Sequence, residues 1–113
     1  MLFLVISTPA PTRPSEVREA RKSFWPWVED KLARGLARSF YPRAGRGAVV
    51  VFDVDSHETL HRLLNEWSEA VPAEFAVYPL MEPESIKAFL NEEPGGGGPE
   101  RSTRLAGMLF GSD

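Results

Sequence analysis

The chain contains no cysteine and only two histidines among its 113 residues. Without cysteine, disulfide bonds, thiolate metal sites and cysteine nucleophiles are excluded, and the composition fits a reducing compartment. Basic residues are also few, with 13 Lys and Arg against 16 Asp and Glu and a formal net charge of −3. A broad surface for nucleic acid needs clustered Lys and Arg, so we expect no nucleic-acid partner.

Long hydrophobic runs are missing as well. Residues 1–7, MLFLVIS, are apolar, but this run is short, lacks a basic leader and is soon followed by PAPTRP. A signal peptide has a basic start and a longer apolar core, and a membrane-spanning helix needs about 20 apolar residues. We therefore expect a first β-strand here, in a cytoplasmic protein without a membrane partner.

Three short segments are apolar at every position or nearly so, and as β-strands they would be apolar on both faces. They are residues 2–6, 49–52 and 75–78. Strands of this kind are covered on both faces of their sheet. The chain has only two good helices, which are enough to cover one face. A second copy of the same sheet is the simplest cover for the other, and this predicts a homodimer or a higher homo-oligomer.

The first helix is expected after Pro14, with Ser15 as its N-cap and Gly35 near its end. An apolar stripe at helical spacing indicates its buried side, and Pro26 interrupts the helix and should kink it. The stripe consists of Val17, Ala20, Phe24, Trp27 and Val28.

The second helix is expected after Asp55, which can cap it with Glu58 as the partner in a capping box. Its buried stripe consists of Leu60, Leu63, Leu64 and Trp67.

Further strands at 37–41 and 74–80 and a short third helix at 82–91 complete the chain order β-α-β-β-α-β plus a C-terminal helix. This order predicts an α+β, ferredoxin-like fold with a four-stranded antiparallel sheet in a domain of residues 1–91. Residues 92–113 then form a Gly-rich flexible tail with an apolar end. That end is either disordered or docked in a groove of its own subunit or of a partner.

Residues 57–61, HETLH, match the H-E-x-x-H zinc signature, in which two histidines bind the metal and the glutamate acts as a base. A catalytic zinc needs a third protein ligand, and both histidines of the chain are already in the motif. The helix also begins near His57, so His57 would have to bind the metal from the first turn of the helix, which frays. We therefore expect no metal site.

The same region resembles muconolactone Δ-isomerase and its relatives. The resemblance rests on V-F-D-V-D-S at residues 51–56 followed by E-x-L-H at 58–61, with weaker matches at residues 1–3, 44–45 and 79–80. It covers roughly residues 1–85. It implies a ferredoxin-like domain that pairs into a dimeric α+β barrel. It also implies a cofactor-free enzyme that moves a proton and a double bond within an unsaturated lactone during aromatic catabolism.

The chain departs from these isomerases at several pocket positions. Leu4 and Ser39 stand where the relatives have histidines, and Arg46-Gly47 replaces a histidine–tyrosine pair. These changes favour a relative with another substrate, or one without chemistry.

An isomerase needs an acid, a base and a group that stabilises enolate charge. Lys31 is one catalytic candidate, because it shares the helical angle of Phe24 and Trp27 and burial lowers a lysine pKa. The alternative is that Lys31 extends to solvent near the helix C-terminus. His61 is the other candidate, since histidine is the side chain that most often acts as an acid or a base at neutral pH. The alternative is that its ring packs at the edge of the leucine stripe.

Six further residues are candidates for binding a substrate. An arginine could hold a carboxylate in a bidentate clamp, a tyrosine could donate to an oxyanion, and a tryptophan beside a helix kink could form the wall of a pocket for a planar apolar ligand. The alternatives are a solvated loop for each arginine, a wet boundary hydroxyl for each tyrosine and dimer packing for the tryptophan. The candidates are Arg38, Arg43, Arg46, Tyr41, Tyr78 and Trp25.

Two functions remain open. The first is a cofactor-free, muconolactone isomerase-like enzyme acting on a small apolar or carboxylate-bearing molecule between helices and sheet. The second is a non-catalytic ligand-binding or assembly module on the same dimeric barrel. An enzyme should bring at least two ionisable groups to its pocket, whereas a module should have an apolar interior and a docked tail.

Overall fold

A computed structural model describes residues 1–92 of the chain. Its four strands form one antiparallel sheet in the order β2-β3-β1-β4. The predicted α+β class, the element order and the ferredoxin-like arrangement are confirmed. The elements are β1 (Leu2–Pro9), η1 (Pro14–Val17), α1 (Arg18–Ala33), β2 (Ala37–Pro42), β3 (Ala48–Asp53), α2 (His57–Ala70), β4 (Ala73–Leu80) and α3 (Pro83–Asn91).

The chain divides after Leu80 into two units. The first contains the sheet with α1 and α2, and the second begins at Met81 and contains α3. In α3, Ile86 and Leu90 are half-buried and Phe89 is exposed. None of the described helices is long and apolar enough to cross a membrane. The predicted tail, residues 92–113, lies outside the described residues except for Glu92.

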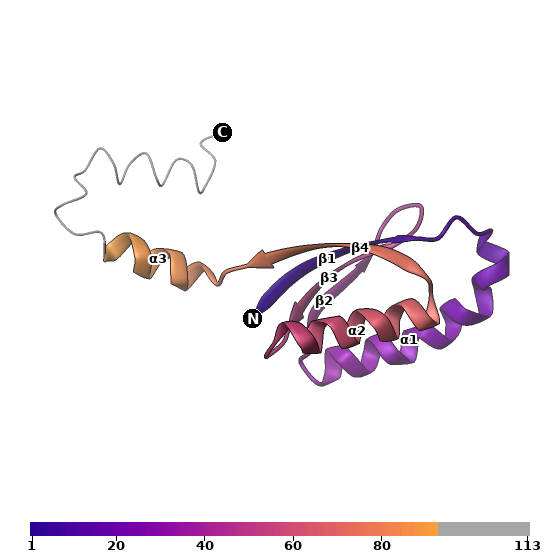
Figure 1. Ribbon diagram of the computed structural model, residues 1–113, viewed down its shortest axis with the longest axis horizontal. Helices are drawn as coiled ribbons and strands as arrows, with labels where there is room; N and C mark the ends of the chain where they lie inside the picture. Colours follow the sequence, from indigo (N-terminus) through magenta and orange to yellow (C-terminus); the bar gives the residue numbers. More distant parts are fainter. Residues whose placement is uncertain (93–113) are drawn as a thin grey trace. The chain divides into compact units, whose positions relative to one another are not determined.

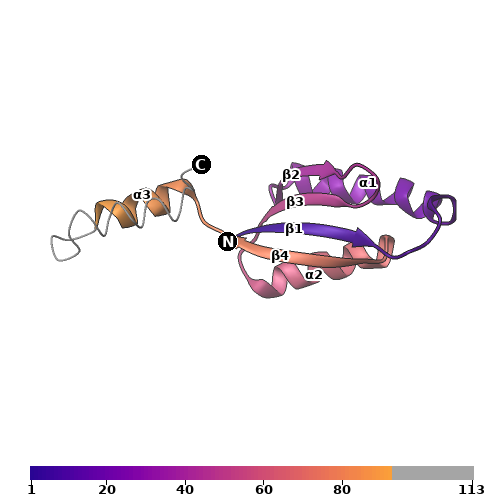
Figure 2. The ribbon, with the colours of Figure 1, turned by 90° about the horizontal axis from the view of Figure 1, so that it is seen from above.

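Both long helices of the first unit cover the same face of the sheet (Figures 1 and 2). Side chains alternate between the two faces of a strand. In β1 the residues that face the helices are Phe3, Val5 and Ser7, and all three are buried. Across the sheet, Phe3 pairs with Phe52 and Val5 with Val50, so the helix-facing core continues into β3.

The other face of the sheet is also apolar. Leu4 is flanked by Val51 on β3 and Tyr78 on β4, and Ile6 pairs with Val49. Within the Met1–Leu80 unit no helix covers these residues (Figure 2). The strands are therefore apolar on both faces, as their sequences indicated. A second copy of the chain as the cover stays a prediction.

The helix caps differ from those expected. Ser15 caps no helix, because Pro14–Val17 forms a 3₁₀ turn and α1 begins only at Arg18. For α2 the cap is Ser56 rather than Asp55. Ser56 has an extended backbone, and its Oγ accepts the backbone N–H of Thr59 at 3.1 Å, as an N-cap requires. Asp55 instead accepts the Thr59 hydroxyl at 2.6 Å.

Candidate functional site

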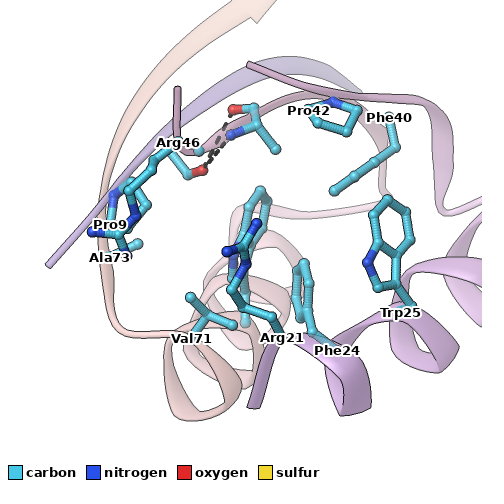
Figure 3. Close-up of a pocket in the computed structure, with 13 residues that line it drawn as sticks. Pro9, Arg21, Phe24, Trp25, Phe40, Pro42, Arg46, Val71 and Ala73 are labelled. Carbon is cyan, nitrogen blue, oxygen red and sulfur yellow. Dashed lines mark hydrogen bonds between the residues drawn. The ribbon is translucent and has the colours of Figure 1, made fainter. Parts of the chain in front are cut away.

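A pocket of about 90 Å³ opens between the helices and one end of the sheet. It lies where β1 and β2 end, where β3 and β4 begin, and beside the first half of α1 and the end of α2. In Figure 3, Arg21, Phe24 and Trp25 extend from their helix toward the strands that carry Phe40 and Pro42. The pocket therefore lies between the two layers of the domain.

Four aromatic side chains form the apolar part of this pocket, which we call the aromatic slot: Phe24, Trp25, Phe40 and Trp67. The ring centroids of Phe24 and Trp67 are 5.3 Å apart, and Trp25 meets Phe40 edge-on at the same distance. Trp67 is almost fully buried, whereas Trp25 is 45% exposed. The slot thus reaches from the core to the surface, and its faces suit a flat ring.

Two arginines supply the charge of the pocket. Among the described residues that line it, Arg21 and Arg46 are charged and none is acidic. Arg46 Nη1 donates to the carbonyl oxygens of Thr12 at 2.7 Å and Ala10 at 3.3 Å, and these bonds fix the position of the guanidinium. The Arg46 side chain is half-buried. Its Nε and Nη2 bind no described group. Arg21 has no ion pair or hydrogen bond within residues 1–92. Both arginines therefore have free donors for an anion.

Ser7 is the one polar side chain of the pocket that is buried, with 2% of its surface exposed. Its Oγ accepts the backbone N–H of Ala48 at 2.8 Å and donates to the Ala48 carbonyl at 3.4 Å. Next to it, Gly47 has a positive φ of 98°, and a Cβ there would overlap the Ser7 carbonyl oxygen. Only glycine lets the β2–β3 hairpin approach β1 this closely.

Two of the predicted substrate-binding residues, Trp25 and Arg46, line the pocket. Tyr41 and Tyr78 are exposed and belong to the other face of the sheet, since Tyr41 pairs with Val49 and Tyr78 with Leu4. Neither tyrosine therefore lines the pocket.

The other two predicted arginines hold parts of the fold. Arg43 Nη1 donates to the Ser7 carbonyl at 3.0 Å, beside the pocket but outside its lining. Arg38 binds Asp53 at 2.7 Å, at the end of β3 remote from the pocket. Hydrogen bonding from the Arg38 guanidinium holds the pKa of the Asp53 carboxyl below its usual value.

Lys31 is buried, at 8% exposure, which fits the alternative based on its position on the helical stripe. Its ammonium is 3.0 Å from Asp30 Oδ2, 3.9 Å from Glu66 Oε1 and 5.3 Å from the centroid of the Trp27 ring. These contacts lie outside the lining of the pocket. Through its contact with Glu66, Lys31 joins α1 to α2. The catalytic role of Lys31 stays a prediction.

His61 is exposed on the outer side of α2, in a shallow groove with Glu58 and Arg62. It does not line the aromatic pocket, and its catalytic role also stays a prediction. The other histidine of the HETLH motif, His57, packs its ring against Phe3 with centroids 5.6 Å apart. Within residues 1–92 no cluster of three His, Asp or Glu side chains could hold a metal ion.

Arg21 and Ser7 were not predicted as site residues. The sequence could have indicated Ser7, because strand alternation places its hydroxyl at the core-facing position that follows Phe3 and Val5. The indication for Arg21 was weaker, since it lies three residues before Phe24 and four before Trp25, hence on the same side of the helix.

Residues 1–93 match a protein family described as a domain of unknown function, DUF3303. No curated protein matches the chain.

Proposed function

Because the chain belongs to the DUF3303 family, whose function is unknown, its activity has to be inferred from the site, and we propose that it binds a small, flat, carboxylate-bearing molecule. The observation that carries this proposal is one pocket that combines an aromatic slot with two arginines and has no acidic side chain among its described lining residues. The ring of the ligand lies in the slot, and its carboxylate lies at the arginines.

The chemistry of the two parts is complementary. Trp25, which is 45% exposed, and Phe40 offer ring surface to an apolar ring, while the buried Phe24 and Trp67 close the inner end of the slot. Such contacts exclude water.

A guanidinium binds a carboxylate through two parallel hydrogen bonds, and it does so more strongly in a partly dry site than in water. Arg46 is half-buried and already oriented by Ala10 and Thr12, so little side-chain freedom is lost when it binds the ligand.

The resemblance to muconolactone isomerase extends the proposal to catalysis. In this form the protein is a cofactor-free, cytoplasmic enzyme that transfers a proton and shifts a double bond in an unsaturated lactone or an aromatic-derived compound. Such a step needs a base. Arginine stays protonated in proteins, and a serine hydroxyl is a weak base. The described lining supplies no better base, and Lys31 and His61 of the same subunit lie outside it. In this form of the proposal the base therefore reaches the ligand from a second subunit of a homodimer, with Lys31 and His61 as the candidates.

A non-catalytic binding module is the second candidate. It is supported by the lack of a histidine, lysine or carboxylate among the described residues that line the pocket. In this form the same ligand is held and released unchanged.

The test is proton NMR of muconolactone with the pure protein in D₂O, next to benzoate titrated against tryptophan fluorescence. Conversion of muconolactone, or deuterium entering it, supports the enzyme, and Lys31→Ala and His61→Ala then identify the base. Benzoate binding without exchange supports the module. If neither compound binds at millimolar concentration, the proposed function is wrong.

A further inference from the structure

We propose that Ser7 selects the ligand of this pocket, by binding an oxygen atom on the ring at the end opposite its carboxylate. The preferred ligand is then a single-ring carboxylate that carries a hydroxyl, carbonyl or lactone oxygen. This inference rests on the proposed function, because it concerns the same pocket and names the class of molecule in it.

The position of Ser7 in β1 is the first reason. Phe3, Val5 and Ser7 face the helices in turn, and the first two fill the core with apolar atoms. Within residues 1–92 the only other buried polar or charged side chain is Lys31, which lies outside the pocket. The strand thus places one hydroxyl at the point where its core-facing side reaches the pocket.

The hydrogen-bonding capacity of the hydroxyl is the second reason. A serine hydroxyl has one donor hydrogen and two acceptor lone pairs. The Ala48 N–H uses one lone pair at 2.8 Å, and the hydrogen has only the Ala48 carbonyl at 3.4 Å. Hydrogen bonds between oxygen atoms are usually about 2.7–2.8 Å long. A ligand oxygen at that distance is a better partner, and one lone pair is still free for a ligand hydroxyl.

The positions of Arg21 and Ser7 set the orientation of the ligand in the pocket. Arg21 is exposed on α1, whereas Ser7 is buried in the sheet. In Figure 3, Arg21 and Phe24 extend from their helix toward the sheet side of the pocket, and Ser7 belongs to that side as a residue of β1. A molecule with its carboxylate at Arg21 therefore points its other end toward the sheet, where Ser7 lies.

The size of the pocket limits the ligand to one ring. Its volume is about 90 Å³, while a closed apolar cavity that holds benzene measures about 150 Å³. A single ring therefore enters only in part, with its carboxylate end at the open side, and a fused pair of rings would leave still more apolar surface outside. Naphthoate should therefore bind more weakly than benzoate despite its larger apolar surface.

The experiment compares ligands that differ only in the ring oxygen. Calorimetry with the wild-type protein measures benzoate, 3- and 4-hydroxybenzoate, and 3- and 4-methylbenzoate, in which the methyl group matches the hydroxyl in size. We expect one hydroxy isomer to bind about three- to tenfold more tightly than its methyl counterpart, the effect of one neutral hydrogen bond. Ser7→Ala should remove this preference, so that the hydroxy isomer and its methyl counterpart bind equally.

Ser39→Ala is the matched control, because Ser39 pairs with Val51 on the opposite face of the sheet. It should keep the preference for the hydroxy isomer. If benzoate binds and each hydroxy isomer equals its methyl counterpart, the inference about Ser7 is wrong while the proposed function survives. A preference that persists in folded Ser7→Ala also overturns it. If Ser7→Ala does not fold, the wild-type ligand pairs still decide.

Discussion

The indole N–H of Trp27 donates a 2.7 Å hydrogen bond to Oε1 of Glu66, and this bond joins α1 to α2. The ring of Trp27 stacks on Phe24, with centroids 5.3 Å apart and planes inclined by 20°. Phe24 is in turn a wall of the aromatic slot. A polar contact between two helices therefore positions a side chain of the pocket, although neither partner of the contact touches it.

Removing this contact should lower stability. We expect Glu66→Ala, which also removes the 3.9 Å contact to Lys31, to reduce the free energy of unfolding by about 1 kcal/mol. This is less than a bond to a charged group usually contributes, because Glu66 is 43% exposed. Urea unfolding followed by circular dichroism measures the change. Glu69→Ala, one turn on and also exposed, is the control and should cost less than about 0.5 kcal/mol. Equal losses in the two variants would show that the Trp27–Glu66 bond contributes nothing.

Arg21 should contribute affinity without contributing stability. It is exposed and has no ion pair or hydrogen bond with another of the described residues, so Arg21→Ala should unfold at the wild-type urea concentration. Benzoate affinity should fall about tenfold, as expected for a lost charge-assisted contact, and should depend less on salt than in the wild type. The measurement is a calorimetric titration at low and at high sodium chloride.

Arg62→Ala is the control for Arg21→Ala, since Arg62 lies on the outer side of α2. Its affinity for benzoate should stay within about twofold of the wild-type value. An equal loss in both variants would indicate a general effect of net charge rather than a contact in the pocket.

Asp53 should make stability depend on pH in the acidic range. Arg38 holds the pKa of the folded Asp53 carboxyl below its ordinary value of 3.8. A carboxyl with a lowered folded pKa stabilises the fold above its unfolded pKa, and that contribution is lost as pH falls through the folded pKa. Asp53→Asn should therefore be less stable than the wild type at pH 7, with a difference that shrinks steadily below about pH 4.

Thermal unfolding of both proteins from pH 7 to pH 2 measures this difference. A gap in melting temperature that stays constant down to pH 2 would mean that the charge of Asp53 is not the cause. Glu74→Gln, an exposed carboxylate near the start of β4, is the control and should follow the wild type throughout.

The sheet face that no helix of the Met1–Leu80 unit covers should make the protein a dimer. Leu4, Val51 and Ile6 lie on that face together, and burying them against a second copy removes their apolar surface from water. Light scattering should give twice the monomer mass at micromolar concentration, and Leu4→Lys should give a monomer. Leu32→Lys, on an exposed position of α1, should stay dimeric. A wild-type monomer would mean that something else covers the face.

The sequence predicted the sheet and helices well because periodicity reports which side of an element is buried. Continuous apolar runs at 2–6 and 49–52 became central strands, and the stripe that includes Leu60 and Trp67 became the core side of α2. The caps were harder, because Asp55 and Ser56 are both good cap residues and only the backbone conformation decides between them.

The site was predicted only in part, because periodicity gives a side chain's direction and not its partner. Burial of Lys31 was one of two alternatives that the sequence left open, and its neighbour Glu66 lies on another helix and could not be read from the sequence. Trp25 and Arg46 were found through their chemistry. Arg21 was missed because an exposed arginine on a helix has no distinguishing pattern until the opposite wall of a pocket is known.

Gly47 restricts how this pocket can diversify among related chains. Any side chain at this position would collide with the backbone of β1, so Gly47 itself cannot be used to reshape the opening. Ligand preference varies most easily on the helix side, at residues such as Arg21 and Trp25, which border solvent and can change without disturbing the sheet. We would look for differences in ligand between family members on α1, with the sheet side of the pocket held constant.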